Sequence, residues 1–139
     1  AFTVQHHPVD PAVGYRFDYK GRSLVISGDT AKSATVQAMS KDVDLLLHEA
    51  LAPHLVGIMN KAASNNNVPI IAKITYDILD YHTTPVEAAE IATEANVGHL
   101  AYYHIVPALL APGAESALVR GVHDAVSYTN LTLATIRSV

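Results

Sequence analysis

Four polar groups, spread over the middle of the chain, carry residue types that bind metal ions and move protons. They are Asp29 in SGDT, His48-Glu49 in LLLHEA, His82 in DYHTTP and His104 in AYYHIV. Three of them follow apolar runs that predict strands, and His82 lies just before a predicted helix. The carboxyl ends of strands in an open α/β sheet form the edge at which sites assemble. Any single member of the set is most simply a helix cap or a turn residue. The set as a whole suits zinc, manganese or iron, which accept carboxylate and imidazole ligands.

The spacing of apolar residues predicts the elements that would position these groups. A Lys20-Gly21 turn joins strands 15–19 and 22–27, and Thr84-Pro85-Val86-Glu87 is a capping box that starts a helix. The remaining expected strands are 43–47, 99–104 and 128–136, and the remaining expected helices are 31–40 (capped by Thr30 or Asp29), 53–64, 68–80 and 114–125. Because strands alternate with helices, we expect a single α/β domain over residues 1–139 with a partly parallel sheet.

The composition of the chain excludes several classes of protein. With 139 residues, half of them hydrophobic, the chain can form one domain that buries about two-thirds of its unfolded surface. The net charge of −4 offers no basic face for nucleic acid, so any attraction for RNA must come from elsewhere. The absence of cysteine excludes disulfides and thiolate metal sites. No apolar run approaches the roughly 20 residues of a membrane span, so no membrane role is expected. The compartment stays open, with the cytoplasm favoured.

Taken in order, SGDT, LLLHEA, DYHTTPVEAAEIA and LAYYHIVP resemble the C-terminal half of metallo-β-lactamase-fold hydrolases, in particular the ribonuclease Z and arylsulfatase-like branch. The resemblance runs from His7 to about Ala125. It implies half of an αβ/βα sandwich, a mixed sheet with helices on one face. It also implies metal-dependent hydrolysis of phosphodiester, sulfate-ester or related ester bonds, on an RNA or small-molecule substrate.

The resemblance implies a role for each matching residue. Asp29 matches an aspartate that bridges two metal ions, zinc in the first instance with manganese or iron as alternatives, and His104 matches the final metal-ligand histidine. His82 matches a histidine that contacts the scissile group or donates a proton. His48, Glu49 and Thr83 match residues that support the site from nearby.

Some residues depart from the pattern or have no match. Leu51 stands where the family usually has Thr, Thr83 replaces Ser, and Tyr103 precedes His104 where Thr is frequent. No carboxylate lies just before Gly28, so an acidic partner for His82 must come from elsewhere. His6 and His7, in a predicted loop near the mouth of the site, are either substrate contacts or exposed loop histidines.

The HxHxDH motif, which supplies most of the metal ligands in the family, is absent from the sequence. A catalytic zinc ion generally needs three protein ligands, and this chain offers two. The first residue is Ala rather than Met, which suggests processing, a removed tag or a fragment. We therefore expect weak or absent metal binding and no activity in the isolated chain. We also expect an uncovered apolar sheet face that pairs with a missing N-terminal half or with a second copy in a homodimer. The alternative is a non-catalytic α/β binding or assembly module that uses the same open sheet for self-association.

Overall fold

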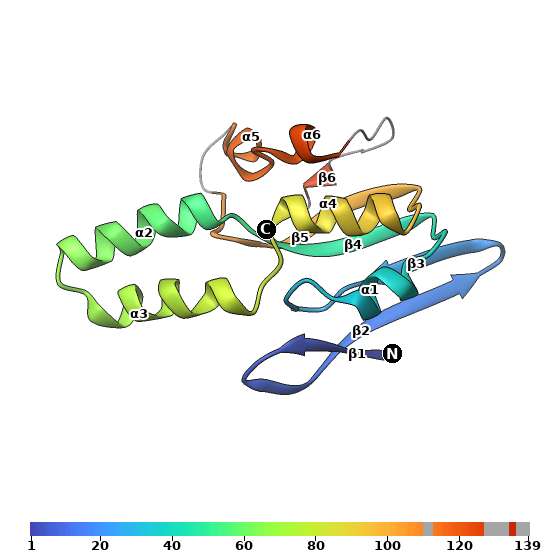
Figure 1. Ribbon diagram of the computed structural model, residues 1–139, viewed down its shortest axis with the longest axis horizontal. Coiled ribbons are helices and arrows are strands. Elements are labelled where there is room, and N and C mark those ends of the chain that lie inside the picture. Colours follow the sequence, from blue (N-terminus) through green and yellow to red (C-terminus); the bar gives the residue numbers. More distant parts are fainter. Residues whose placement is uncertain (110–112, 127–133, 136–139) are drawn as a thin grey trace.

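A computed structural model describes residues 1–109, 113–126 and 134–135 (Figure 1). The strands are β1 (Phe2–His6), β2 (Val9–Tyr19), β3 (Arg22–Ile26), β4 (Leu45–Leu51), β5 (His99–Val106) and β6 (Ala134–Thr135). The helices are α1 (Ala34–Met39), α2 (Pro53–Asn65), α3 (Pro69–Asp77), the 3-10 turn η1 (Ile78–Asp80), α4 (Pro85–Glu94), α5 (Ala114–Leu118) and α6 (Val122–Ala125). No described helix is long and apolar enough to cross a membrane.

The strands form one mixed sheet in the order of the chain, β1-β2-β3-β4-β5-β6. β1, β2 and β3 are antiparallel neighbours, and β3 to β6 are parallel. Lys20 and Gly21 both have positive φ, 47° and 73°, as expected for a two-residue hairpin turn whose twist matches its strands. The parallel pairs require crossovers, and α1, α2 to α4, and α5 to α6 occupy them. The expected α/β fold class and the mixed sheet are confirmed.

Helices α1 and α4 lie on one face of the sheet and cover the core (Figure 1). Thr84 caps α4, because its hydroxyl accepts from the Glu87 backbone N–H while the Glu87 carboxylate accepts from the Thr84 N–H. Val25 and Leu46, in the centre of the sheet, are fully buried. The small side chains of α4 allow the helix to approach the sheet closely, and Ala88, Ala89, Ile91 and Ala92 are fully buried with them.

The opposite face of the sheet carries apolar side chains that the described residues leave partly uncovered. Tyr15 and Phe17 on β2 are 44% and 52% exposed. They lie in register with Ile26 and Leu24 on β3, which are only half-buried. This face is therefore available to another protein surface.

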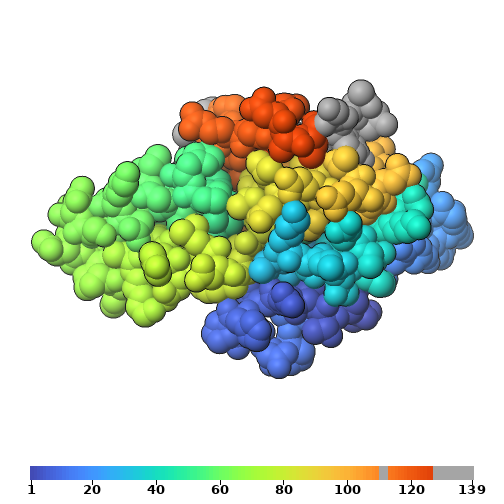
Figure 2. All heavy atoms as spheres, in the orientation of Figure 1, coloured from blue at the N-terminus to red at the C-terminus, as the bar shows by residue number. Residues whose placement is uncertain are grey.

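Helices α2 and α3 form an antiparallel pair that extends away from the end of the sheet (Figures 1 and 2). The Asn60 amide on α2 donates to the Ala72 carbonyl at 2.6 Å and to the Thr75 hydroxyl at 2.9 Å on α3. Pro69 occupies the first turn of α3, where its missing N–H leaves no unsatisfied bond. The pair confirms the two helices predicted for 53–64 and 68–80.

Several predicted boundaries were wrong. The first helix begins at Ala34 rather than 31, and its cap is Ser33, whose hydroxyl accepts from the Val36 N–H. Thr30 cannot cap it, because its hydroxyl accepts from the Gln5 N–H and donates to the Ala31 carbonyl. The predicted helix over 114–125 is two short helices, α5 and α6, separated at Gly121, which adopts φ 83°.

The ends of the sheet also differ from the prediction. Residues 2–6 form the edge strand β1, which the sequence pattern did not predict, so His6 ends a strand instead of lying in a loop. β4 continues through Leu51, which places His48 and Glu49 inside a strand and not after one. Of the strand expected over 128–136, residues 134–135 form β6, and the others lie outside the described residues.

Candidate active site

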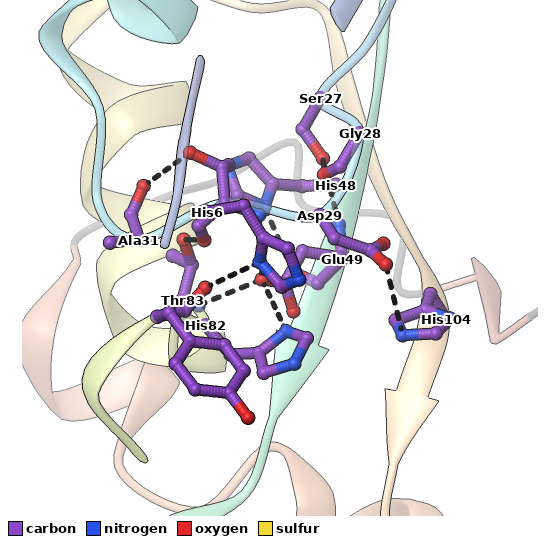
Figure 3. Close-up of polar contacts among 12 residues, drawn as sticks. His6, Ser27, Gly28, Asp29, Ala31, His48, Glu49, His82, Thr83 and His104 are labelled. Atoms are coloured by element: carbon purple, nitrogen blue, oxygen red, sulfur yellow. Dashed lines mark hydrogen bonds and ion pairs between the residues drawn. The ribbon is translucent and has the colours of Figure 1, made fainter. Parts of the chain in front are cut away.

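Asp29 and His104 meet across the carboxyl edge of the sheet. Asp29 follows β3, and its Oδ2 lies 3.5 Å from Nε2 of His104 on β5 (Figure 3). The side chains are 39% and 45% exposed, so both reach solvent. The preceding Gly28 adopts φ 69°, and a Cβ there would lie 2.2 Å from the Val13 carbonyl oxygen. Only glycine permits the close turn that delivers Asp29 to the edge.

A β-bulge in β5 directs His104. Glu49 of β4 pairs with Tyr103, but the next residue, Ala50, pairs with Ile105, so His104 is the extra residue between them. It adopts φ 43°, which is uncommon for a non-glycine residue. Bulges often re-aim a side chain beside an active site, and this one belongs to the arrangement that brings His104 to Asp29.

Glu49 and His82 form a second, buried pair. The Glu49 carboxylate is fully buried, the His82 side chain is 8% exposed, and Oε1 lies 3.0 Å from His82 Nδ1. A carboxylate accepts, so Nδ1 carries the proton and His82 donates it. The structure gives Nε2 of His82 no hydrogen-bond partner among the described residues, which leaves this nitrogen to act on a ligand. Glu49 is thus the acidic partner that sequence reasoning could not locate.

The same Glu49 oxygen ties together three segments of chain. Oε1 also accepts from the backbone N–H of Thr30 at 3.2 Å and of Thr83 at 2.9 Å. The Thr83 hydroxyl, fully buried, donates to the Thr30 carbonyl at 2.6 Å. The loop after β3, the end of β4 and the loop before α4 are therefore held in one arrangement around a single carboxylate.

The two pairs are adjacent. The His82 and His104 rings are stacked, with centroids 5.8 Å apart and an interplanar angle of 26°. Tyr103, beside His104, is partly buried, and this burial raises the pKa of its phenol. Asp29, Glu49, His82 and His104 therefore form one cluster, as Figure 3 shows.

His48 takes no part in this cluster. It is fully buried in register with Tyr102 on the helix-covered side, and its Nδ1–H donates to the Glu49 carbonyl at 2.8 Å. Burial lowers the pKa of His48, so the neutral form is favoured. Its Nε2 is a buried nitrogen without a hydrogen-bond partner among the described residues. The structure places this predicted supporting residue behind the site rather than in it.

The two N-terminal histidines separate. His6 contacts the cluster, with its ring centroid 4.9 Å from that of His82. His7 is exposed in the turn after β1. The sequence offered no signal to distinguish them, because their placement depends on the pairing of β1 with β2.

The donor atoms suit part of a metal centre. A carboxylate oxygen and an imidazole nitrogen converge at Asp29 and His104, as zinc, manganese or iron would require. Among the described residues, however, no group of three or more His, Asp or Glu side chains could hold a metal ion. The described part of the chain therefore supplies two donors, fewer than the three protein ligands of a catalytic zinc site.

The order of the strands and the helices that cover the sheet give this chain the α/β architecture of the metallo-β-lactamase fold. Its fold matches a crystal structure of the metallo-β-lactamase fold protein YhfI from Bacillus subtilis with a TM-score of 0.66 and 19% identity, over 99% of this chain and 45% of that one. This likeness establishes the fold.

Within that class, the chain is similar in sequence to ribonuclease Z. It is 34% identical over 108 residues to ribonuclease Z of Mycobacterium avium, a match that covers 78% of this chain and 35% of the relative. It is 34% identical over 112 residues to ribonuclease Z of Mycobacterium tuberculosis, covering 81% and 37%. The chain thus spans little more than a third of the length of these relatives. No model of a known protein family matches it.

Proposed function

We propose that this chain is the C-terminal part of a metal-dependent hydrolase that cleaves phosphodiester bonds in RNA. The observation that carries the proposal is the pairing of Asp29 and His104 directly beside the Glu49–His82 dyad. Sequence similarity to ribonuclease Z over about a third of its length supports both the substrate class and the partial nature of the chain. The remaining ligands would come from a segment with the HxHxDH motif.

Asp29 and His104 would hold the metal in this scheme. When bound, two zinc-type ions would supply an activated water and a polarised phosphate. The chain's own contribution to bond cleavage is the dyad. Glu49 accepts the Nδ1 proton of His82 and so keeps the imidazole in one tautomer and one orientation. Both side chains are withdrawn from water, which strengthens this interaction.

His82 would act as the general acid. Water adds to phosphorus and releases one proton to the solvent, while the bond from phosphorus to the leaving oxygen breaks and that oxygen takes a proton from Nε2 of protonated His82. The resulting neutral imidazole keeps its Nδ1–H bonded to Glu49. A positioned imidazole of this kind typically contributes a factor of about 10²–10⁴ in rate.

The substrate is RNA rather than a sulfate ester in this proposal, because the similarity in sequence is to ribonuclease Z. The net charge of −4 does not attract a polyanion. The basic surface for RNA would therefore lie in the remainder of the enzyme, along with the missing ligands. The open sheet face around Tyr15 and Phe17 would pack against that remainder, and the isolated chain would bind zinc weakly and be inactive.

The test compares this chain with a longer protein that contains it. Zinc content is measured by mass spectrometry, and hydrolysis is measured with an RNA, with bis(p-nitrophenyl) phosphate and with p-nitrophenyl sulfate. We expect zinc and phosphodiesterase activity in the longer protein only, abolished by Asp29→Ala and retained by the control Asp124→Ala, an exposed carboxylate on α6. Stoichiometric zinc with turnover in this chain alone would contradict the incomplete site. Full activity of Asp29→Ala would contradict the ligand role.

The exposed apolar face favours one alternative, a non-catalytic module that self-associates through its sheet. Tyr15 and Phe17 are about half exposed, and a large apolar patch commonly marks an interface. A C2 dimer would stack two identical faces. Sedimentation velocity distinguishes the two roles: a stable dimer that binds no metal in any longer form supports the module.

A further inference from the structure

Two aromatic rings that the proposed chemistry does not use lie against His82. The ring centroid of His6 is 4.9 Å from that of His82, and the centroid of Tyr81 is 5.2 Å from it. His6 and Tyr81 also contact each other, at 5.0 Å and 87°. The three rings come from the end of β1 and from the loop before α4, segments far apart in the sequence. Figure 3 shows His6 beside His82.

The His6 ring is fixed in place. Its Nδ1 lies 2.9 Å from the Tyr81 carbonyl oxygen, and because a carbonyl only accepts, Nδ1 carries the proton. The preceding residue, Gln5, is held by two backbone contacts: its carbonyl accepts from the Ala31 N–H at 2.8 Å, and its N–H donates to the Thr30 hydroxyl at 3.2 Å. The edge strand therefore delivers His6 to the loop before α4 in a defined orientation.

Neither ring serves the hydrophobic core. His6 and Tyr81 are each partly exposed, and neither belongs to the buried cluster beneath α4. The His6 contacts with Tyr81 and His82 are edge-to-face, at 87° and 70°. Such contacts occupy the edge of one ring and one face of the other, so ring surface remains available to a further planar group.

We propose that His6 and Tyr81 form an aromatic platform for the nucleobase next to the scissile phosphate, in which the base stacks on the face of one ring and meets the other ring at its edge, because the two rings are 87° apart. This inference rests on the proposed function and adds to it a site for a specific part of the substrate. Bases stack on aromatic side chains with little dependence on sequence, because every base has a π-face. A base seated on the platform would position its phosphate at His82, the ring that both platform residues contact.

The experiment compares two ligands that share a phosphate and differ only in the base, AMP and ribose 5-phosphate. Their affinities for the chain are measured by NMR from the shifts of the histidine ring signals. We expect AMP to bind roughly tenfold or more tightly. Each of two single variants, Tyr81→Leu and His6→Gln, should make the affinities for AMP and ribose 5-phosphate equal. Glutamine at position 6 keeps a hydrogen-bond donor for the Tyr81 carbonyl. Tyr81→Phe should preserve the difference, as should the control Tyr19→Leu, a change at an exposed tyrosine on the β2–β3 hairpin.

Equal affinities in the unchanged chain, no binding of either ligand, or an AMP preference that survives both ring-removing changes would each overturn the platform. If Tyr81→Leu does not fold, His6→Gln alone decides. A merely structural role for the rings would not produce a difference that depends on the base. The outcome is also separable from the proposed function. If the longer protein hydrolyses RNA but the chain does not prefer AMP over ribose 5-phosphate, only the platform is wrong. If the chain prefers AMP but the longer protein does not hydrolyse RNA, only the proposed function is wrong.

Discussion

The most informative perturbation of this chain is at Glu49, whose single oxygen accepts from His82 and from two backbone N–H groups. Glu49→Ala leaves the N–H groups of Thr30 and Thr83 buried without an acceptor. Each such loss costs about 1–3 kcal/mol. We therefore expect Glu49→Ala to lower the free energy of unfolding by about 2–6 kcal/mol.

Glu49→Gln separates the hydrogen bonds from the charge. An amide oxygen still accepts from the two N–H groups, so only the additional strength of charge-assisted bonds is lost. We expect this change to cost about 1–2 kcal/mol, well below the cost of alanine. In the longer protein, it should nevertheless reduce hydrolysis strongly, because an amide cannot stabilise protonated His82 as a carboxylate does.

Urea unfolding followed by circular dichroism measures both variants against the unchanged chain. Glu94→Ala is the matched control: Glu94 is exposed at the end of α4, and its replacement should change stability by less than about 0.5 kcal/mol. The reasoning is refuted if Glu49→Ala costs less than about 1 kcal/mol, or if glutamine is as destabilising as alanine.

Three further predictions concern the chain itself. Burial lowers the pKa of His48 below its ordinary value of 6.5, so below pH 6.5 the unfolded chain binds a proton at this residue that the folded chain does not. The contribution of His48 to the free energy of unfolding is therefore constant above pH 6.5 and falls by up to about 1.4 kcal/mol for each pH unit below it. Urea unfolding at a series of pH values should show this slope, reduced in His48→Asn. Gly28→Ala should lower the free energy of unfolding by at least about 2 kcal/mol, because Gly28 has a positive φ and a Cβ there would clash with the Val13 carbonyl oxygen. The control Gly57→Ala, in α2, should be neutral or stabilising. If thermal unfolding ranks the two variants otherwise, the argument that the turn requires glycine is wrong. Phe17→Thr on the open sheet face should shift any self-association, measured by sedimentation velocity, towards the monomer, and should change the free energy of unfolding by less than about 1 kcal/mol. An unchanged sedimentation profile would show that self-association uses another surface.

The local elements were largely predictable from the sequence. The Lys20-Gly21 hairpin and the Thr84–Glu87 capping box depend on neighbouring residues, and both occur as expected. The predictions were wrong where a segment distant in the sequence forms a hydrogen bond with a side chain that local patterns assign to a cap. Thr30 looked like a helix cap, but Gln5 of β1 engages its hydroxyl, and the cap shifts to Ser33. β1 itself was missed because an edge strand is defined by its partner, β2.

Sequence patterns alone indicated an α/β protein with Asp29, His48-Glu49, His82 and His104 near one edge of a sheet. Periodicity, caps and turns act over a few residues, and the order of strands and helices follows from them. Which of these groups pair, and that His48 lies behind the others, depends on the folded arrangement of the strands. The bulge that directs His104 to Asp29 depends on the register between β4 and β5. The Glu49–His82 contact joins residues 33 positions apart in the chain. Such contacts result from strand register and packing, which no local pattern encodes.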